Sequence, residues 1–184
     1  MKFKPPWRLT SPPEPDLRVL MVCMGNICRS PTAEGVLRAQ LQRAGLGDRV
    51  AVDSAGTHGC HTGEAPDPRA IRPAAQRGYD IASQRARPVG LDDFARFHWL
   101  LAMDEANLAW LHKRAPLSHG ARIELLMPHA RRHPQMLEVP DPYYGPPAGF
   151  EQVLNLVEDA CQGLVDRLRH ELSRRPEPAP GRPA

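Results

Sequence analysis

Long hydrophobic runs are missing from this 184-residue sequence. No apolar stretch approaches the roughly 18 residues that a membrane-spanning helix requires, so we expect no membrane association. Residues 1–15 contain no apolar core of the kind found in secretion signals and are interrupted by prolines. We therefore also expect no cleaved signal peptide.

Cysteine is scarce, with four residues in total, and these follow no compact spacing pattern. This argues against a disulfide framework and favours a reducing compartment, the cytoplasm. The excess of positive charge is small, +3 at pH 7, and gives no argument for a nucleic-acid partner. Hydrophobic residues make up 41% of the chain, which excludes a fully disordered protein, and the length suits one globular domain.

Proline is unevenly distributed, because nine of the 21 prolines lie in residues 1–16 and 174–184. Proline-rich ends cannot sustain regular hydrogen bonding, so we predict disordered tails at 1–16 and 174–184. A docking segment of the PxxP type is the functional alternative for these tails. The predicted folded domain is residues 17–173.

Short apolar segments alternate with helical patterns inside this domain. The expected strands are residues 17–22, 50–52, 99–103 and 122–126, and the expected helices are 30–44, 68–77, one from 104 and 150–172. Such alternation predicts an α/β fold with a parallel sheet that is covered by helices on both faces. Ligands bind beyond the carboxyl ends of the strands in sheets of this kind, so the segment after the first strand is the expected site.

Cys23 and Arg29 flank the loop that follows the first expected strand. The loop contains Gly25 and leads into a helix for which Ser30 is the expected N-cap and Pro31 the expected first residue. A helix N-terminus presents free N–H groups that bind a dianion such as phosphate and stabilise a thiolate. The arginine guanidinium matches two phosphoryl oxygens. A buried strand-end cysteine beside a surface arginine is the structural alternative.

A second cysteine–arginine pair, Cys161 and Arg167, has the same spacing but lies inside the expected last helix. Six residues rotate by about 240° along a helix, so these two side chains diverge. Cys161 also belongs to the apolar stripe of that helix, which predicts a core cysteine. Position after a strand, and not spacing alone, therefore distinguishes Cys23.

Four segments resemble the motifs of one known family in their order along the chain. They are VCMGNICRSP at 22–31, DSAGT at 53–57, AMD at 102–104 and DPYY at 141–144, and they resemble the low molecular weight protein tyrosine phosphatases. The resemblance covers residues 17–173. It implies a single three-layer domain with a four-stranded parallel sheet and a phosphate-binding loop after the first strand. It further implies hydrolysis of phosphotyrosine through a cysteinyl-phosphate, without a metal or other cofactor.

The resemblance also implies roles for individual residues. Cys23 is the expected nucleophile, Arg29 the phosphate clamp and Asp141 the general acid. The expected substrate-binding residues belong to the loop and to the later tyrosine pair: Met24, Gly25, Asn26, Ile27, Cys28, Ser30, Tyr143 and Tyr144.

Supporting roles follow from the same resemblance. Asn26 is expected to hold the loop, and asparagine tolerates the left-handed backbone that such a turn demands. The Ser30 hydroxyl is expected to donate to the thiolate, and Ser54 to support Asn26 from outside the loop. Cys28 matches a second cysteine that can trap an oxidised nucleophile as a reversible disulfide, and both thiols lie on one tight loop.

Two aspartates are candidates for the group that protonates the leaving phenolate. Asp141 lies between Pro140 and Pro142, which stiffen its loop, although an Asp-Pro turn is also ordinary surface chemistry. Asp104 stands at an expected helix start, where a simple N-cap is the alternative role.

Two positions depart from the pattern of many relatives. Cys60 stands where many have an aromatic residue on one wall of the cleft, and Gln84 where many bacterial relatives have a histidine near Asn26. These departures leave substrate preference and loop support open. His58, Cys60 and His61 resemble part of a metal site, but no second pair of ligands follows at zinc-like spacing, so no metal is expected.

Three other functions remain open at this stage. A thiol-dependent arsenate reductase of the same fold needs relay cysteines, of which only Cys60 is free to act. A phosphoarginine phosphatase resembles the loop but carries threonine where Ile27 stands. A catalytically silent phosphotyrosine-binding module needs neither a nucleophile nor an acid. The expected partners are phosphotyrosine-containing proteins, among them a cognate bacterial tyrosine kinase.

Overall fold

Four parallel strands form the centre of the structure, a computed structural model that describes residues 14–175. The sheet order is β2-β1-β3-β4, which confirms the predicted four-stranded parallel sheet. The strands are β1 (Leu17–Cys23), β2 (Val50–Gly56), β3 (Trp99–Ala102) and β4 (Arg122–Leu125). The central strand β1 pairs with β2 over its whole length, so that Cys23 and Gly56 end the two strands side by side.

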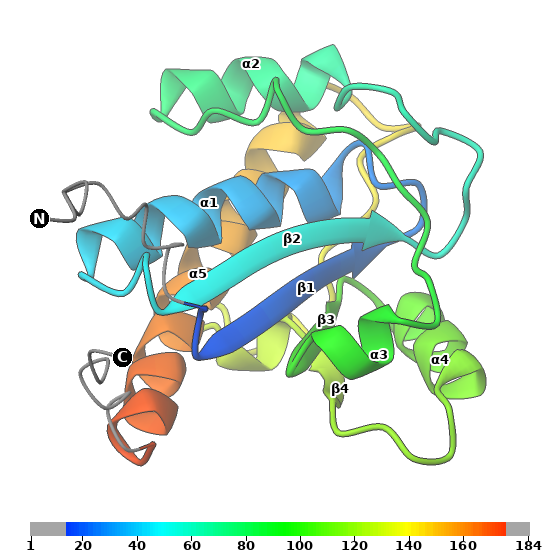
Figure 1. The fold of residues 1–184 in the computed structure, drawn as a ribbon. Helices are drawn as coiled ribbons and strands as arrows, with labels where there is room; N and C mark the ends of the chain where they lie inside the picture. The colour runs from blue at the N-terminus through cyan, green and yellow to red at the C-terminus, as the bar shows by residue number, and fades with distance from the viewer. Residues whose placement is uncertain (1–13, 176–184) are drawn as a thin grey trace, which may run out of the picture.

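Helices cover both faces of this sheet (Figure 1), which confirms the three-layer α/β architecture. On one side lie α1 (Arg29–Arg43), α2 (Pro68–Gln76) and α5 (Ala148–Ser173), and on the other lie α3 (Asp93–Arg96) and α4 (Glu105–Arg114). A 3₁₀ helix, η1 (Met127–His129), follows β4. Within residues 14–175, no helix has both the length and the apolar character needed to cross a membrane.

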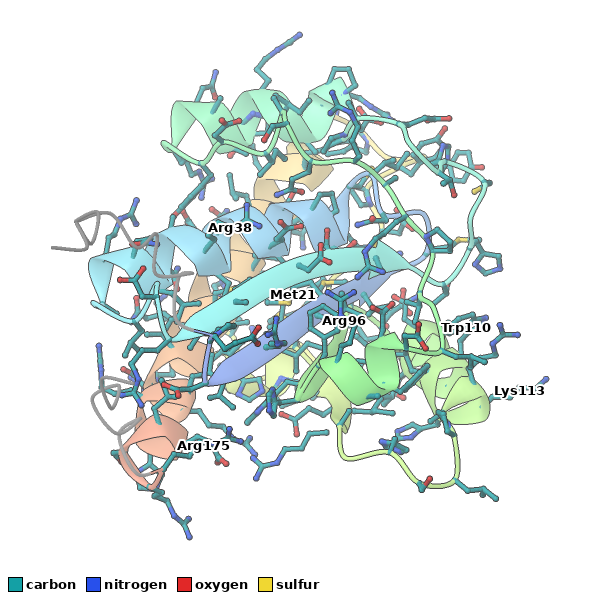
Figure 2. The ribbon with its side chains drawn as sticks, in the orientation of Figure 1. Met21, Arg38, Arg96, Trp110, Lys113 and Arg175 are labelled. Carbon is teal, nitrogen blue, oxygen red and sulfur yellow. The ribbon has the colours of Figure 1, made fainter. Side chains whose placement is uncertain are left out.

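Strand β1 is apolar on both faces because helices cover both of its faces. Val19 and Met21 belong to the hydrophobic cluster with α1 and α5, whereas Leu20 and Val22 belong to the cluster on the α3 and α4 side. Figure 2 shows the contrast between Met21, which lies within the sheet, and Lys113, which points outward from α4. The continuous apolar run in the sequence is therefore the signature of a strand that is buried from both sides.

Some local features differ from the sequence-based expectations. The first helix begins at Arg29 with Cys28 at its N-cap position, so the predicted start at Ser30 and Pro31 is wrong. Ser30 does not cap the helix, because its hydroxyl lies 3.0 Å from the sulfur of Cys23. The short elements α3 and η1 were not predicted, since three or four residues are too few to show a period. Of the predicted tails, residues 1–13 and 176–184 lie outside the described residues.

Two backbone features bring the ends of β1 and β2 together at the site. Asn26 adopts a φ of 57°, in the left-handed region that asparagine tolerates better than most residues. Gly56 has no room for a side chain, since a Cβ atom there would lie 2.7 Å from the carbonyl oxygen of Met24. The chain after β1 can therefore turn tightly against the end of β2.

Candidate active site

The phosphate-binding loop, residues 23–29, wraps around the sulfur atom of Cys23 at the N-terminus of α1. The backbone N–H of Asn26 donates to Cys23 Sγ over 3.3 Å, and the Ser30 hydroxyl lies 3.0 Å from the same atom. The Asn26 side-chain amide donates to Ser30 Oγ over 2.9 Å, and the Ser30 hydroxyl also lies 3.4 Å from the carbonyl oxygen of Ala55. A backbone N–H group and a hydroxyl group thus converge on one sulfur atom.

The side chain of Asn26 fixes the shape of this loop from behind. Its amide group donates to Ser30 Oγ and to Ser54 Oγ, each over 2.9 Å, and its carbonyl oxygen accepts the backbone N–H of Arg87. Ser54 in turn donates to the carboxyl group of Glu34 over 2.6 Å. Burial raises the pKa of the Glu34 carboxyl, which the Ser54 hydroxyl partly offsets. The structure thus brings Asn26 and Ser54 into direct contact.

The backbone donor on Arg87 was missed by sequence reasoning. Gln84 does not reach the loop asparagine, because its side-chain amide donates to the carbonyl of Pro31 over 3.1 Å. The Arg87 side chain instead forms ion pairs with Asp53 at 2.8 Å and Asp93 at 2.9 Å, which hold its backbone beside the loop. A backbone N–H can come from any residue except proline, so no residue type marks it in the sequence.

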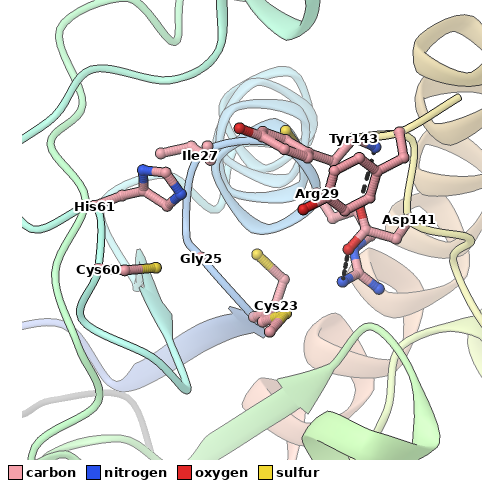
Figure 3. Close-up of a pocket in the computed structure, with 11 residues that line it drawn as sticks. Cys23, Gly25, Ile27, Arg29, Cys60, His61, Asp141 and Tyr143 are labelled. Carbon is pink, nitrogen blue, oxygen red and sulfur yellow. Dashed lines mark hydrogen bonds and ion pairs between the residues drawn. The ribbon is translucent and has the colours of Figure 1, made fainter. Parts of the chain in front are cut away.

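Arg29 is buried at the side of the pocket with its guanidinium between two carboxylates (Figure 3). It lies 2.5 Å from Asp104 and 2.7 Å from Asp141, and it also donates to the carbonyl of Val139 over 3.2 Å. Burial acts against the charge, but Cys23 and the two carboxylates outweigh it and raise the pKa of Arg29. The guanidinium is therefore held in one orientation with its charge intact.

Asp104 and Asp141 differ in the hydrogen-bond partners of their carboxylates and in the exposure of their side chains. Asp104 is the N-cap of α4, where it accepts the N–H of Asn107 over 2.7 Å while it pairs with Arg29. Its side chain is 20% exposed, whereas that of Asp141 is 46% exposed and lines the pocket. Of these two carboxylates, Asp141 is the one that lines the cavity.

A cavity of about 230 Å³ opens above Cys23. The three expected catalytic residues line it together with six of the eight expected binding residues, which are Met24, Gly25, Ile27, Cys28, Tyr143 and Tyr144. Of these, Tyr144 is almost fully exposed. Asn26 and Ser30 do not line the cavity and instead support the loop from behind. The lining also includes Cys60 and His61, which lie across the mouth from Tyr143 (Figure 3).

His61 is a cavity residue that sequence reasoning considered only as part of a metal site. Its ring packs over Gly25, where a Cβ atom would lie 3.1 Å from it, and its Nδ1 lies 2.9 Å from the carboxylate of Glu64. His58 pairs instead with the hydroxyl of Thr57 over 2.9 Å. Across residues 14–175, no cluster of three or more histidine, cysteine and acidic side chains is arranged to hold a metal ion.

The second and fourth cysteines are in apolar surroundings. Burial, with contributions from Asp67 and Cys23, raises the pKa of Cys28 to about 12. Cys161 is fully buried in α5, as its place on the apolar stripe predicts, and burial also raises its pKa. All four cysteines are free thiols in the structure.

Comparisons with known proteins identify the family of this chain. The model of the family described as low molecular weight phosphotyrosine protein phosphatase matches residues 18–174. A putative low molecular weight protein-tyrosine-phosphatase of Synechocystis is 42% identical over 157 residues, which cover 85% of this chain and 99% of the relative.

Solved structures give the same result. A protein tyrosine phosphatase from Entamoeba histolytica superimposes with a TM-score of 0.81 at 37% identity and covers 85% of this chain and 99% of its own. A Drosophila arginine phosphatase gives a TM-score of 0.77 at 30% identity, and the match covers 86% of this chain and 100% of the Drosophila chain. The chain therefore belongs to the low molecular weight phosphotyrosine protein phosphatase family and is a phosphoric monoester hydrolase.

Proposed function

We propose that this enzyme hydrolyses phosphotyrosine in proteins through a cysteinyl-phosphate on Cys23. The observation that carries the proposal is the position of the Cys23 sulfur, at the base of a cavity with the Ser30 hydroxyl 3.0 Å away and Arg29 beside it. Tyr143 lies at the mouth of the same cavity, where it can contact an aryl ring. A thiolate, a phosphate clamp and an aromatic wall suit an aryl phosphate monoester.

In the first step, the phosphoryl group enters the loop and takes the place of Asp141 on Arg29. The Cys23 thiolate attacks phosphorus as the bond to the phenol oxygen breaks. Asp141, which takes up a proton from solvent as the phosphate enters, gives that proton to the departing oxygen. Arg29 and the loop N–H groups stabilise the equatorial oxygens throughout. The products are tyrosine and the cysteinyl-phosphate.

In the second step, water replaces the phenol. The Asp141 carboxylate accepts a proton from that water as its oxygen attacks phosphorus, and the sulfur–phosphorus bond breaks. The pair of electrons returns to sulfur, where the Ser30 hydroxyl and the Asn26 N–H stabilise the thiolate. Inorganic phosphate leaves, Asp141 gives its proton to solvent, and its carboxylate pairs with Arg29 again.

The alternatives share this loop and differ in what enters it. The likeness to an arginine phosphatase keeps phosphoarginine as a second substrate class, but Ile27 lines this cavity with an apolar surface that favours an aryl ring. For arsenate reduction, Cys161 cannot act as a relay because it is fully buried, and the other thiols that line the cavity beside Cys23 are Cys28 and Cys60. A catalytic thiol also requires reducing surroundings, so we propose the cytoplasm and cytoplasmic phosphoproteins, a tyrosine kinase among them, as its setting.

The test is turnover of an aryl phosphate by the purified protein in the presence of a chelator. We expect activity without added metal, and its loss in Cys23→Ser, because an alkoxide is not available at neutral pH without a base. Turnover that survives Cys23→Ser would overturn the thiolate mechanism. Phosphoarginine and arsenate, tested on the same preparation, would identify either alternative.

A further inference from the structure

We propose that Arg69 is a positioning residue that couples the phosphate-binding loop to the loop carrying Asp141. Arg69 lies in the first turn of α2, and its guanidinium donates to the carbonyl oxygen of Tyr143 over 3.0 Å. The segment before α5, yellow in Figure 1, runs beside this end of α2. The inference rests on the proposed function, because it concerns how the acid of that reaction is held.

One side of this connection reaches the phosphate-binding loop through Asp67. The backbone N–H of Asp67 donates to the carbonyl of Ile27 over 2.8 Å. Its carboxylate accepts the backbone N–H of Arg69 and also the guanidinium, with bonds of 3.0 Å and 2.7 Å to different oxygens. Hydrogen bonds from Arg69 hold the pKa of Asp67 below its ordinary range. Asp67 therefore fixes the guanidinium relative to Ile27.

The other side reaches Asp141 through Tyr143. The guanidinium of Arg69 lies 5.3 Å from the centre of the Tyr143 ring and 4.8 Å from that of Phe150, at the start of α5. Tyr143 then donates its backbone N–H to Asp141 Oδ1 over 3.1 Å. A hydrogen-bonded path thus runs from the Ile27 carbonyl to the carboxylate of the acid.

This path has a specific purpose in the proposed reaction. The contact of Asp141 with Arg29 at 2.7 Å has to break when a phosphoryl group enters. The Tyr143 N–H is then the remaining described contact of the carboxyl, and Arg69 keeps that N–H at a fixed place relative to the phosphate-binding loop. An arginine suits the task because its planar fork serves two carboxylate oxygens and a carbonyl at once, which a lysine cannot do.

The experiment compares leaving groups in Arg69→Met, which keeps the apolar stem but loses the fork. We expect kcat/KM to fall about tenfold for phenyl phosphate, whose phenolate needs the proton, and less than about threefold for nitrophenyl phosphate. Inhibition by inorganic phosphate should stay within about twofold of wild type, because Arg29 and the loop are untouched. Arg72→Met removes an exposed arginine from the same helix and should behave as wild type.

Arg69→Lys is the second variant, and it keeps the proposal testable if the methionine variant does not fold. We expect it to show the same selective loss for phenyl phosphate, in a milder form. Equal losses for both substrates in either variant, or a lysine variant identical to wild type, would overturn the coupling. Wild type without activity on either aryl phosphate would instead refute the proposed function.

Discussion

Replacement of Asp141 by asparagine separates the proton donor from the rest of the site. One carboxylate oxygen of Asp141 lies 2.7 Å from Arg29, and the other accepts the N–H of Tyr143 over 3.1 Å. Asparagine has the same shape and keeps an oxygen that can accept from Tyr143, so the loop should stay in place. It has no proton to give a phenolate and accepts none from water, so the proton transfer of both steps is lost. The ratio kcat/KM reports the first step and therefore isolates the role of the donor.

The expected loss in kcat/KM is set by the proton transfer. General acid assistance contributes about 10²–10⁴-fold, which corresponds to roughly 3–5 kcal/mol of barrier. In Asp141→Asn, kcat/KM should fall by this factor for phosphotyrosine. It should fall much less for the phosphates of phenols that are acidic enough to leave as phenolates. Across a series of aryl phosphates, kcat/KM should depend weakly on the acidity of the phenol in wild type and strongly in the variant.

The same variant should bind inorganic phosphate more tightly, which a misfolded site would not do. A phosphate dianion in the loop has to displace the Asp141 carboxylate from Arg29 and then lies close to it. Two unit charges 4 Å apart interact by about 1 kcal/mol in water and more in a partly buried site. Removal of the carboxylate charge should therefore lower the inhibition constant of phosphate about fivefold or more.

Asp104→Asn is the matched control, because this carboxylate also pairs with Arg29 but is occupied as the N-cap of α4. Its variant should lower kcat/KM by a similar factor for all phenols, since it disturbs the phosphate clamp and not the proton. Parallel dependences on phenol acidity in wild type and Asp141→Asn would refute the assignment of Asp141. A steep dependence in Asp104→Asn would transfer the role to Asp104.

Two further predictions concern Cys28. Peroxide should inactivate the enzyme at the Cys23 thiolate. Dithiothreitol should then restore the activity of wild type but not of Cys28→Ser, because only wild type can store the oxidised sulfur as a disulfide. Equal recovery of activity would reduce Cys28 to a packing residue. The folded state favours the neutral Cys28 thiol, because burial raises the pKa of this group from 9.0 to about 12. The stability that the neutral thiol contributes is therefore complete below pH 9 and is lost as the pH rises toward 12. Between about pH 8 and pH 10.5, the free energy of unfolding measured in urea should therefore fall by about 2 kcal/mol more for wild type than for Cys28→Ser. An equal fall in the two proteins would contradict a buried thiol at Cys28.

The parts of the fold that could be predicted are those with a repeating pattern or a strong local signal. The apolar run at the start of the domain predicted β1, and a cysteine placed after that strand predicted the site. The predicted start of the first helix was wrong. Serine before proline is typical of an N-cap, but the Ser30 hydroxyl faces the Cys23 sulfur instead. A local preference was overridden there by a contact within the site.

Contacts that depend on the folded backbone could not be predicted in the same way. The N–H of Arg87 supports the loop asparagine, and the carbonyl of Tyr143 receives Arg69, yet neither group depends on residue type. Arg69 and Tyr143 are also 74 positions apart in the sequence, and no periodicity relates them. His61 gave a local signal only for a metal, and its position at the cavity mouth follows from the turn after β2.

The geometry of Arg29 explains why the site has two carboxylates and how their roles divide. A buried guanidinium without an anion is costly, so it has to be paired both before and after the substrate binds. Asp104 supplies a permanent partner, because α4 holds its carboxylate in place. In the proposed mechanism, Asp141 supplies a partner that leaves when the phosphoryl group arrives. The same proposal therefore makes the resting counter-ion of the clamp, once substrate has displaced it, the acid of the first step.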